Sequence, residues 1–278
     1  LMLYAGANAE TAAQPIPMQR DDATGVWSVT GEADWKGQFY LYDVEVYAPS
    51  ESAIVHNLVT DPYSFSLSAN STRSQIVDLG DGDLMPDGWV DLPKPAIAAP
   101  TDIVLYELHL RDFSIYDETV PEADRGTYMA FTHPESDGMS HLSRLADAGL
   151  SHIHLLPLFD IATINENVDE QRNVIPKFLE RGEADSHIQQ EAIYALRDED
   201  GFNWGYDPYH YTTPEGSYAT DPDGAQRIVE FRSMVAALNQ TGLRVVMDVV
   251  YNHTNSSGQS DYSVLDRVVP GYYHRLNS

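Results

Sequence analysis

The feature that most constrains the fold is an alternation of strands and helices in the second part of the chain, after residue 100. Three apolar runs predict strands at 103–110, 152–158 and 243–250, and a helical stripe of apolar residues lies in each interval between them. Strands that alternate with helices usually pair in parallel, because each helix carries the chain back along the sheet. The pattern predicts an α/β unit with a parallel sheet, either an open doubly wound sheet or a closed barrel.

Both helical stripes are followed or preceded by residues that commonly bound helices. The first stripe consists of Met139, Leu142 and Leu145, and the second of Ile228, Phe231, Val235 and Leu238. Gly149 and Gly242 follow them, where a glycine commonly ends a helix. Asp221 and Pro222 predict the start of the second helix, as an N-cap followed by proline. The run 243–250 is nearly all apolar, which is typical of a strand that is covered on both faces.

Residues 1–92 show a different pattern, that of antiparallel β structure. The run 37–47 is rich in aromatic and β-branched residues, and its later half alternates apolar and acidic side chains. This alternation is typical of a half-buried strand. Shorter runs at 25–30 and 75–79 predict further strands. Together they favour a β-sandwich.

A proline-rich connector separates the two patterns. Residues 91–100 contain three prolines, which favour an extended, semi-rigid backbone. We therefore expect two domains, a β-sandwich over residues 1–92 and an α/β domain over residues 93–278.

Composition restricts the partners of the chain. The 278 residues include 16 Lys and Arg against 43 Asp and Glu, a formal net charge of −27. Such a polyanion is repelled by nucleic acids and by anionic membranes, and no apolar run is long enough for a membrane span. A neutral or cationic partner is expected. The absence of cysteine excludes disulfides and thiolate chemistry. The first residues carry no signal-peptide profile, and the acidic surplus favours an extracellular or cell-envelope setting of a bacterium through solubility.

One connection, 157–220, is much longer than the usual link between a strand and a helix. It contains five aromatic rings in 202–211, more than a solvated loop requires. Flat rings with polar edges suit stacking on the faces of sugar rings. Gly205 permits an unusual backbone conformation, and Asp207 followed by Pro208 predicts a turn. The loop is interpreted as a sugar-binding segment, and the alternative is an aromatic mini-core that holds a long loop in place.

The end of the third predicted strand carries two polar candidates, Asp248 and His253. A carboxylate in an apolar run is costly unless it is paired or hydrogen-bonded. Catalytic groups cluster at the carboxyl ends of barrel strands. We therefore expect Asp248 and His253 in the site. The alternative is a buried structural aspartate and an exposed loop histidine.

Three other polar groups could bind metal. His152 and His154 lie on one side of a strand and could bind zinc, which would suit a zinc-dependent hydrolase. They begin the strand, away from its active end, so packing is favoured. The acidic stretches 81–88 and 198–200 offer oxygen ligands for calcium, but solvated acidic loops are favoured.

Two motifs resemble a known family. The stretch 203–208, Asn-Trp-Gly-Tyr-Asp-Pro, is similar to the hallmark motif of type I pullulanases. The stretch 248–253, Asp-Val-Val-Tyr-Asn-His, resembles the first conserved region of the α-amylase superfamily, glycoside hydrolase family 13. Residues 37–79 resemble the latter part of a family 48 carbohydrate-binding module. Supporting similarity is found at 106–113, 152–160 and 214–218. The resemblance is strongest to the pullulanase and limit dextrinase branch.

This resemblance implies a fold and a reaction. The fold is a carbohydrate-binding module followed by a (β/α)8 TIM barrel, of which this chain would hold only the first three βα units. The module would be truncated at its start and the barrel at its end. The reaction is hydrolysis of α-1,6-glucosidic links in pullulan, amylopectin or limit dextrins with retention of configuration. The family's nucleophile and acid/base lie on the fourth and fifth barrel strands, beyond Ser278, so this segment alone is expected to be inactive.

The resemblance also assigns roles to single residues. Tyr206 would stack on the sugar at the cleavage subsite, and His253 would hydrogen-bond its hydroxyls. Asp248 would support the site from beneath. Trp204 and Asp207 would shape the branch-point pocket.

No cofactor is required by this interpretation, and no metal is assigned. Asn252 matches a position that ligates calcium in many α-amylases, so a structural calcium ion is compatible with the family. Two alternatives stay open. One is a non-catalytic fragment that binds α-glucan, and the other is an α-1,4-acting relative such as a neopullulanase or an amylase.

Overall fold

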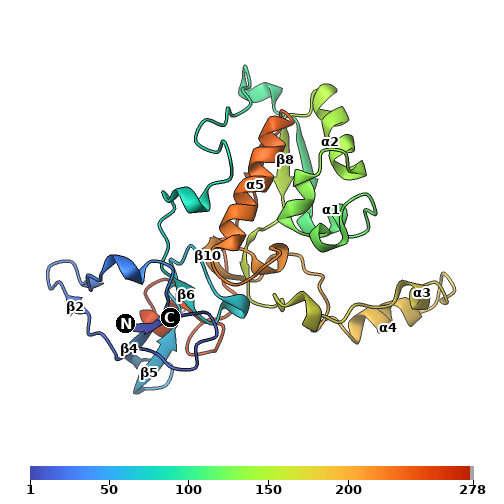
Figure 1. The fold of residues 1–278 in the computed structure, drawn as a ribbon. Coiled ribbons are helices and arrows are strands. Elements are labelled where there is room, and N and C mark those ends of the chain that lie inside the picture. Colours follow the sequence, from blue (N-terminus) through green and yellow to red (C-terminus); the bar gives the residue numbers. More distant parts are fainter. Residues whose placement is uncertain (276–278) are drawn as a thin grey trace.

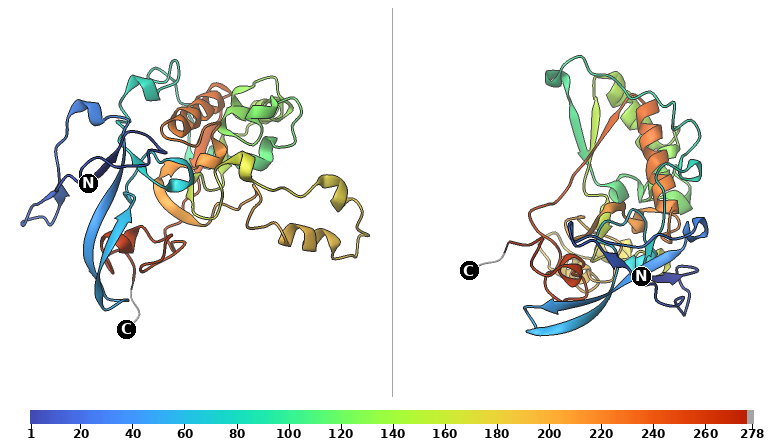
Figure 2. Two further views of the ribbon diagram at one scale, coloured as in Figure 1. Left: turned by 60° about the horizontal axis from the view of Figure 1, so that its bottom comes forward. Right: turned by 90° about the vertical axis from the view of Figure 1, so that its left-hand side faces the viewer.

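The computed structural model describes residues 1–275, without the side chain of Pro176. A β domain, an α/β unit and a projecting helical arm are visible in Figure 1, and the left view of Figure 2 shows the arm standing away from the body. The last three residues of the predicted second domain, 276–278, lie outside the described residues. None of the helices described is long and apolar enough to cross a membrane.

The predicted antiparallel β structure of the first domain is confirmed. A four-stranded sheet has the order β1-β4-β5, with β6 also paired to β4, and β2 and β3 form a separate hairpin. The strands are β1 (Met2–Tyr4), β2 (Gln19–Arg20), β3 (Trp27–Ser28), β4 (Phe39–Ala48), β5 (Ala53–Val59) and β6 (Ser74–Gln75). The strand predicted at 75–79 extends no further than Gln75, because the chain turns where the Asp78 carboxylate accepts a hydrogen bond from the Gly80 amide.

The alternation predicted for 37–47 is confirmed in β4. Asp43 and Glu45 face solvent, whereas Val44 and Val46 are half-buried. Helix α6 (Leu265–Val268) packs against β4 and β5, so the end of the described chain lies on the β domain. This contact is visible as the red segment beside the blue strands in Figure 2.

The second domain contains the predicted parallel sheet. Its strands are β7 (Leu105–Leu108), β8 (His152–Leu155) and β11 (Arg244–Met247), in the order β11-β8-β7. The helices are α1 (Leu110–Ser114), α2 (Asp137–Asp147) and α5 (Gln226–Gln240). Apolar residues of the three strands, α2, α5 and the 3-10 helix η6 (Tyr128–Thr132) form one continuous core.

Two expectations for this domain are wrong. Helix α5 begins at Gln226 and not after Asp221, because the Asp221 carboxylate accepts a hydrogen bond from the Asp223 amide and Gly224 adopts a φ of +76°. The run 243–250 is not covered on both faces by the described residues. Met247 and Val249 are exposed, and only the face toward the helices is packed.

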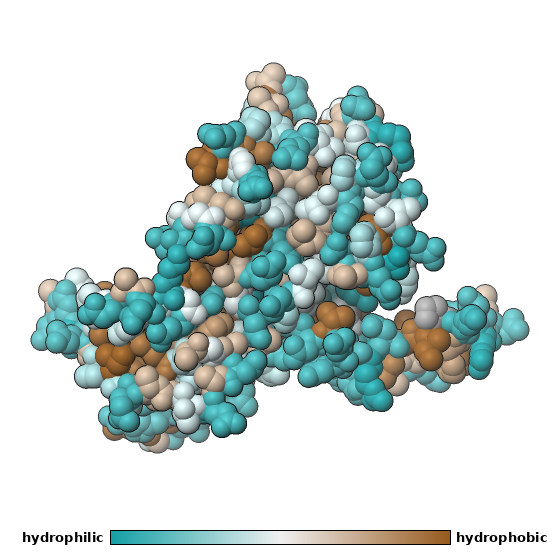
Figure 3. Space-filling view, in the orientation of Figure 1, coloured by the Kyte–Doolittle hydropathy of each residue, from teal (hydrophilic) through white to brown (hydrophobic). Residues whose placement is uncertain are grey.

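The long connection 157–220 has structure of its own. Strands β9 (Phe159–Ile161) and β10 (Pro208–Pro214) pair antiparallel, and the arm between them carries α3 (Pro176–Leu179) and α4 (Ile188–Tyr194). The arm exposes apolar side chains, including Phe178 and Ile188, and Figure 3 shows hydrophobic atoms on it. The remaining 3-10 helices are η1 (Ala33–Trp35), η2 (Ala69–Ser71), η3 (Gly82–Leu84), η4 (Pro100–Asp102), η5 (Glu122–Asp124), η7 (Val168–Glu170) and η8 (Gly216–Tyr218).

Candidate carbohydrate-binding site

The loop that precedes β10 is held tightly against β9. The Ala162 amide donates a hydrogen bond to the Asp207 carbonyl oxygen at 2.9 Å, and the Thr163 hydroxyl donates to the Asp207 carboxylate at 2.8 Å. Gly205 has a φ of +79°, and a Cβ added there would lie 3.0 Å from the Pro157 carbonyl oxygen. Glycine is therefore required at this position both by conformation and by space.

The structure brings together three of the predicted site residues. The Tyr206 hydroxyl donates a hydrogen bond to the Asp248 carboxylate at 2.7 Å. The His253 Nε2 atom lies 2.9 Å from the Tyr206 carbonyl oxygen. Residues more than forty positions apart thus form one cluster, because the loop before β10 lies against the loop that follows β11. The hydrogen bond to Asp248 raises the pKa of Tyr206 to about 12, so its hydroxyl is protonated at neutral pH.

This cluster is open to solvent. Tyr206 is 37% exposed, Trp204 is 64% exposed, and His253 is also exposed. Asp248 is only half-buried, so the carboxylate is not embedded in an apolar core. Available ring faces and a paired carboxylate are groups that can bind a neutral polyol.

The Phe, Trp and Tyr rings of 202–211 are either exposed or half-buried, and none of the five is buried. The Phe202 ring stacks on His109 at 5.8 Å and meets the Trp204 ring edge-on at 5.6 Å. The Tyr218 hydroxyl donates a hydrogen bond to the Asn203 side-chain oxygen at 3.2 Å. Phe202 and Trp204 thus make the ring contacts of the mini-core alternative and also keep the exposed ring surface that sugar binding requires.

Sequence reasoning missed a buried charged cluster behind this loop. Asp160, Glu166, Glu215 and Arg227 are all buried, and the two guanidinium Nη atoms of Arg227 each lie 3.1 Å from a Glu166 carboxylate oxygen. Both Glu215 oxygens accept backbone amide hydrogen bonds, from Ile161 and Ser217. Burial raises the pKa of Glu166 to about 7, against the opposing effect of Arg227, and raises that of Glu215 well above its usual value.

His210 joins this charged cluster to the β domain. Its Nδ1 lies 2.6 Å from an Asp160 carboxylate oxygen, and its Nε2 lies 2.7 Å from the Thr60 hydroxyl. The only signal in the sequence was the continuation of the aromatic run through His210, which does not reveal its partners. The cluster is a buried connection between the β domain and β9 and β10.

The carboxylates of this cluster are also a geometric candidate for a metal. Ligand oxygens of Asp160, Glu166 and Glu215 lie within 4.8 Å of one another, the only such group in residues 1–275. The guanidinium of Arg227 already supplies a positive charge at that place, with a nitrogen 3.8 Å from Asp160. We therefore assign the cluster to structure.

The other metal candidates are dispersed. His152 is buried with its Nδ1 2.8 Å from the Ser151 hydroxyl, and His154 lies 3.5 Å from Glu107. In the stretch 81–88, Asp81 pairs with Lys36 at 2.8 Å. Asp198 is exposed, and Asn252 is exposed in the loop after β11.

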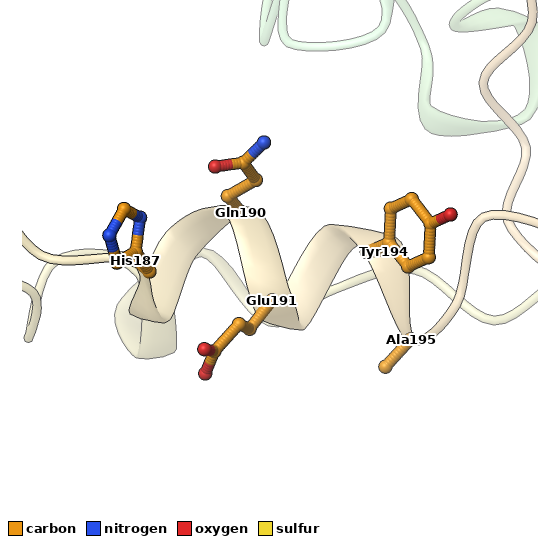
Figure 4. Close-up of a pocket in the computed structure, with 5 residues that line it drawn as sticks. All are labelled: His187, Gln190, Glu191, Tyr194 and Ala195. Carbon is orange, nitrogen blue, oxygen red and sulfur yellow. The ribbon is translucent and has the colours of Figure 1, made fainter.

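A hollow of about 430 Å³ runs along α4 on the projecting arm. It is lined by residues of one exposed helix, including His187, Gln190 and Tyr194. Figure 4 shows Gln190 and Glu191 pointing to opposite sides, so the polar groups do not converge on a common centre. We place no function there.

The β domain matches a known class of carbohydrate-binding module. Residues 5–64 match the family model of carbohydrate-binding module 48, the isoamylase N-terminal domain. Most of the β domain therefore corresponds to such a module.

The relatives are more specific. The chain is 48% identical to pullulanase 1, chloroplastic, of Arabidopsis thaliana over 92% of its own length and 27% of that protein. It superposes on PulA from Klebsiella oxytoca with a TM-score of 0.94 and 40% identity, over 99% of this chain and 30% of that one. It superposes on the maltotriose complex of PulA from Klebsiella pneumoniae with a TM-score of 0.90 and 41% identity, over 99% of this chain and 34% of that one. The resemblance to pullulanases is confirmed, and the chain spans about a third or less of their length.

Proposed function

We propose that residues 93–278 form the first three βα units of a glycosidase barrel and that residues 1–92 form the preceding module. The strands β7, β8 and β11 lie side by side in the order in which the chain makes them. A doubly wound sheet reverses its strand order at a switch point, whereas a barrel adds parallel strands in sequence. Three strands in sequence also occur in the first half of a doubly wound sheet, so the choice of the barrel rests on the resemblance of the 203–208 and 248–253 motifs to glycoside hydrolase family 13.

The proposed activity is hydrolysis of α-1,6-glucosidic links by the whole protein, with retention of configuration. The observation that carries it is the Tyr206–Asp248–His253 cluster, whose loop carries the 203–208 motif that resembles that of type I pullulanases. A retaining glycosidase needs two carboxyl groups about 5–5.5 Å apart. We assign neither to this chain and place the nucleophile and the acid/base on later strands. Asp248 acts as a supporting residue.

The geometry refines the role of each residue. With Nε2 of His253 at the Tyr206 carbonyl oxygen, Nδ1 is the nitrogen available to a sugar hydroxyl. One Asp248 oxygen accepts from Tyr206, which fixes the tyrosine ring for stacking. Trp204 offers a second ring. Asp207 acts through the turn, because Thr163 already occupies its carboxylate.

The substrate class is an α-glucan, which the carbohydrate-binding module match and the maltotriose complex of the Klebsiella pneumoniae relative support. The decisive experiment is an assay on pullulan of this chain beside a longer protein that includes further strands. Release of maltotriose by the longer protein alone is the expected result. Release of panose would indicate α-1,4 cleavage instead. Hydrolysis by the short chain would contradict the placement of the catalytic acids.

The second candidate is glucan binding without cleavage, which the module match over residues 5–64 favours for the chain by itself. Sedimentation with starch granules, compared with release of soluble sugar, separates the two functions. Binding with no sugar release from any longer protein would favour the second candidate.

A further inference from the structure

A second polar hollow, of about 300 Å³, lies where the β domain meets the loop after β9. Its walls come from five separate segments of the chain, represented by Asn70, Thr163, Asp198, Tyr209 and Tyr262. This volume is at the lower end of the range for ligand sites and would admit a single small ring. The hollow is distinct from the Tyr206–Asp248–His253 cluster, none of whose residues line it.

The floor of this hollow is rigidly held. The Glu166 amide donates a hydrogen bond to the Asn70 side-chain oxygen at 2.8 Å, and a Glu166 carboxylate oxygen accepts from the Asn70 amide at 2.6 Å. The Ser71 hydroxyl donates to the Asp160 carboxylate at 2.6 Å. Glu166 and Asp160 belong to the buried charged cluster, so the hollow rests on the most constrained part of the molecule.

The backbone of this wall is strained. Asn70 and Ser71 both have a φ of +54°, in the left-handed region that non-glycine residues rarely adopt. Within residues 1–275, only one other non-glycine residue, Ser52, has a positive φ. Strain of this kind persists only where surrounding contacts enforce it, and it gathers at ligand-binding positions. Two of the three instances line this one hollow.

The free groups of the walls suit a pyranose ring. Because the Asn70 oxygen accepts from an amide, its Nδ2 donors are directed elsewhere. One Asp198 carboxylate oxygen lies 3.4 Å from the Arg197 Nε atom, and the other oxygen can accept from a sugar hydroxyl. Tyr262 is 51% exposed, and its ring packs edge-on against Tyr209 at 5.8 Å, which leaves ring surface for stacking. A hydrogen-bond donor, a hydrogen-bond acceptor and an aromatic ring are the groups that commonly bind a neutral sugar.

We propose that this hollow is an accessory subsite for one glucosyl unit of an α-glucan. The inference rests on the proposed function, since it takes the same ligand class. The Thr163 hydroxyl, part of its wall, donates to Asp207 of the Trp204–Asp207 loop, so the subsite and the main cluster share a rigid support. The subsite lies at the junction of the two domains and depends on residues of both.

The test is a maltotriose soak of crystals of this chain, together with a titration followed by NMR. We expect a glucosyl ring on Tyr262 in addition to one at the Tyr206 cluster. Tyr262→Ala should weaken binding at the accessory subsite about tenfold, by loss of stacking. Tyr262→Phe should keep affinity within about twofold, because the ring remains. Tyr116→Ala, at a residue 80% exposed and outside the hollow, is the matched control and should change nothing.

The outcomes separate this inference from the proposed function. Sugar at the Tyr206 cluster alone would overturn the accessory subsite and leave the proposed function standing. Sugar on Tyr262 alone would support the subsite and contradict the role of Tyr206. Sugar at neither place would contradict both. The proposal would also be overturned if Tyr262→Ala bound maltotriose at this hollow as tightly as the parent. This outcome counts only if the variant unfolds at the same temperature as the parent, which shows that it is folded.

Discussion

Two polar clusters lie only a few residues apart on the same loop, and they differ in almost every physical property. Tyr206 belongs to an open cluster whose groups are exposed or half-buried. His210, four residues later, belongs to a cluster in which every charge is removed from water. The open cluster leaves donors and ring faces free, whereas the buried one uses its polar atoms for internal contacts. The comparison supports our proposal that ligand contact and structural support are divided between adjacent parts of one segment.

The largest expected effect comes from removing Arg227, the cation that pairs with Glu166. Arg227→Met should destabilise the chain by about 3–5 kcal/mol, because buried carboxylates lose their counter-ion. Urea unfolding measures the free energy. Arg172→Met is the matched control, since Arg172 pairs with Glu199 at the same 3.1 Å but on the surface, and it should cost less than about 1 kcal/mol.

A second variant keeps this test decisive if Arg227→Met fails to fold. Adding Glu166→Gln removes the uncompensated charge, so the double variant should recover part of the lost stability. Equal effects of Arg227→Met and Arg172→Met would contradict the distinction between the buried and the exposed cluster.

The second prediction concerns pH. The folded-state pKa of Glu166 is raised to about 7, so the folded state binds more protons than the unfolded state between about pH 4.5 and 7. The protonated Glu166 carboxyl group therefore contributes to the free energy of unfolding. This stabilisation is fully present below pH 4.5 and is lost as pH rises through 7. Burial lowers the pKa of His109, which gives the opposite slope in the same range. Glu166 also raises the pKa of Glu215, so the difference between the parent and Glu166→Gln reports the coupled pair of carboxyl groups and removes the effect of His109.

Urea unfolding at several pH values should therefore show a steeper decline toward pH 7 in the parent than in Glu166→Gln. Tyr206 of the open cluster should not contribute to this pH dependence, because its pKa is about 12 and lies far above the range measured. Parallel pH profiles of parent and variant would show that Glu166 titrates normally.

How much of this could be predicted from sequence depends on the range of the contacts. The parallel strands and α2 follow from local apolar periodicity, and the Tyr206–Asp248 contact follows from a motif loop and a strand end. The pairing of Glu166 with Arg227 has no local signal, because it joins residues 61 positions apart without any periodic pattern. The start of α5 was misplaced because Gly224 and the turn at Asp221 outweigh the N-cap pattern.

The third prediction concerns the backbone that presents Tyr206. Gly205→Ala must place a Cβ 3.0 Å from the Pro157 carbonyl oxygen at a φ of +79°. The loss of unfolding free energy should therefore exceed the cost of the left-handed backbone conformation, because the contact with Pro157 adds to it. Gly242→Ala has a φ of +89° with nothing within 4 Å of the added Cβ, and it should cost about 1–2 kcal/mol. The difference in unfolding free energy measures the clash. Equal costs would mean that the loop moves away from Pro157 freely.

The smallest effect on stability is expected in the open cluster itself. Tyr206→Phe removes one hydrogen bond to Asp248 at a partly exposed position and should cost less than about 1 kcal/mol in urea unfolding. Maltotriose binding should nevertheless weaken, because the ring loses the contact that fixes its orientation. Tyr42→Phe is the matched control, since it removes the same kind of hydroxyl–carboxylate hydrogen bond, to Asp61 at 2.9 Å in the β domain, and should leave maltotriose binding at the cluster unchanged. If Tyr206→Phe lowered stability as much as Arg227→Met while leaving binding intact, the open cluster would be a structural element, and the division between contact and support would fail.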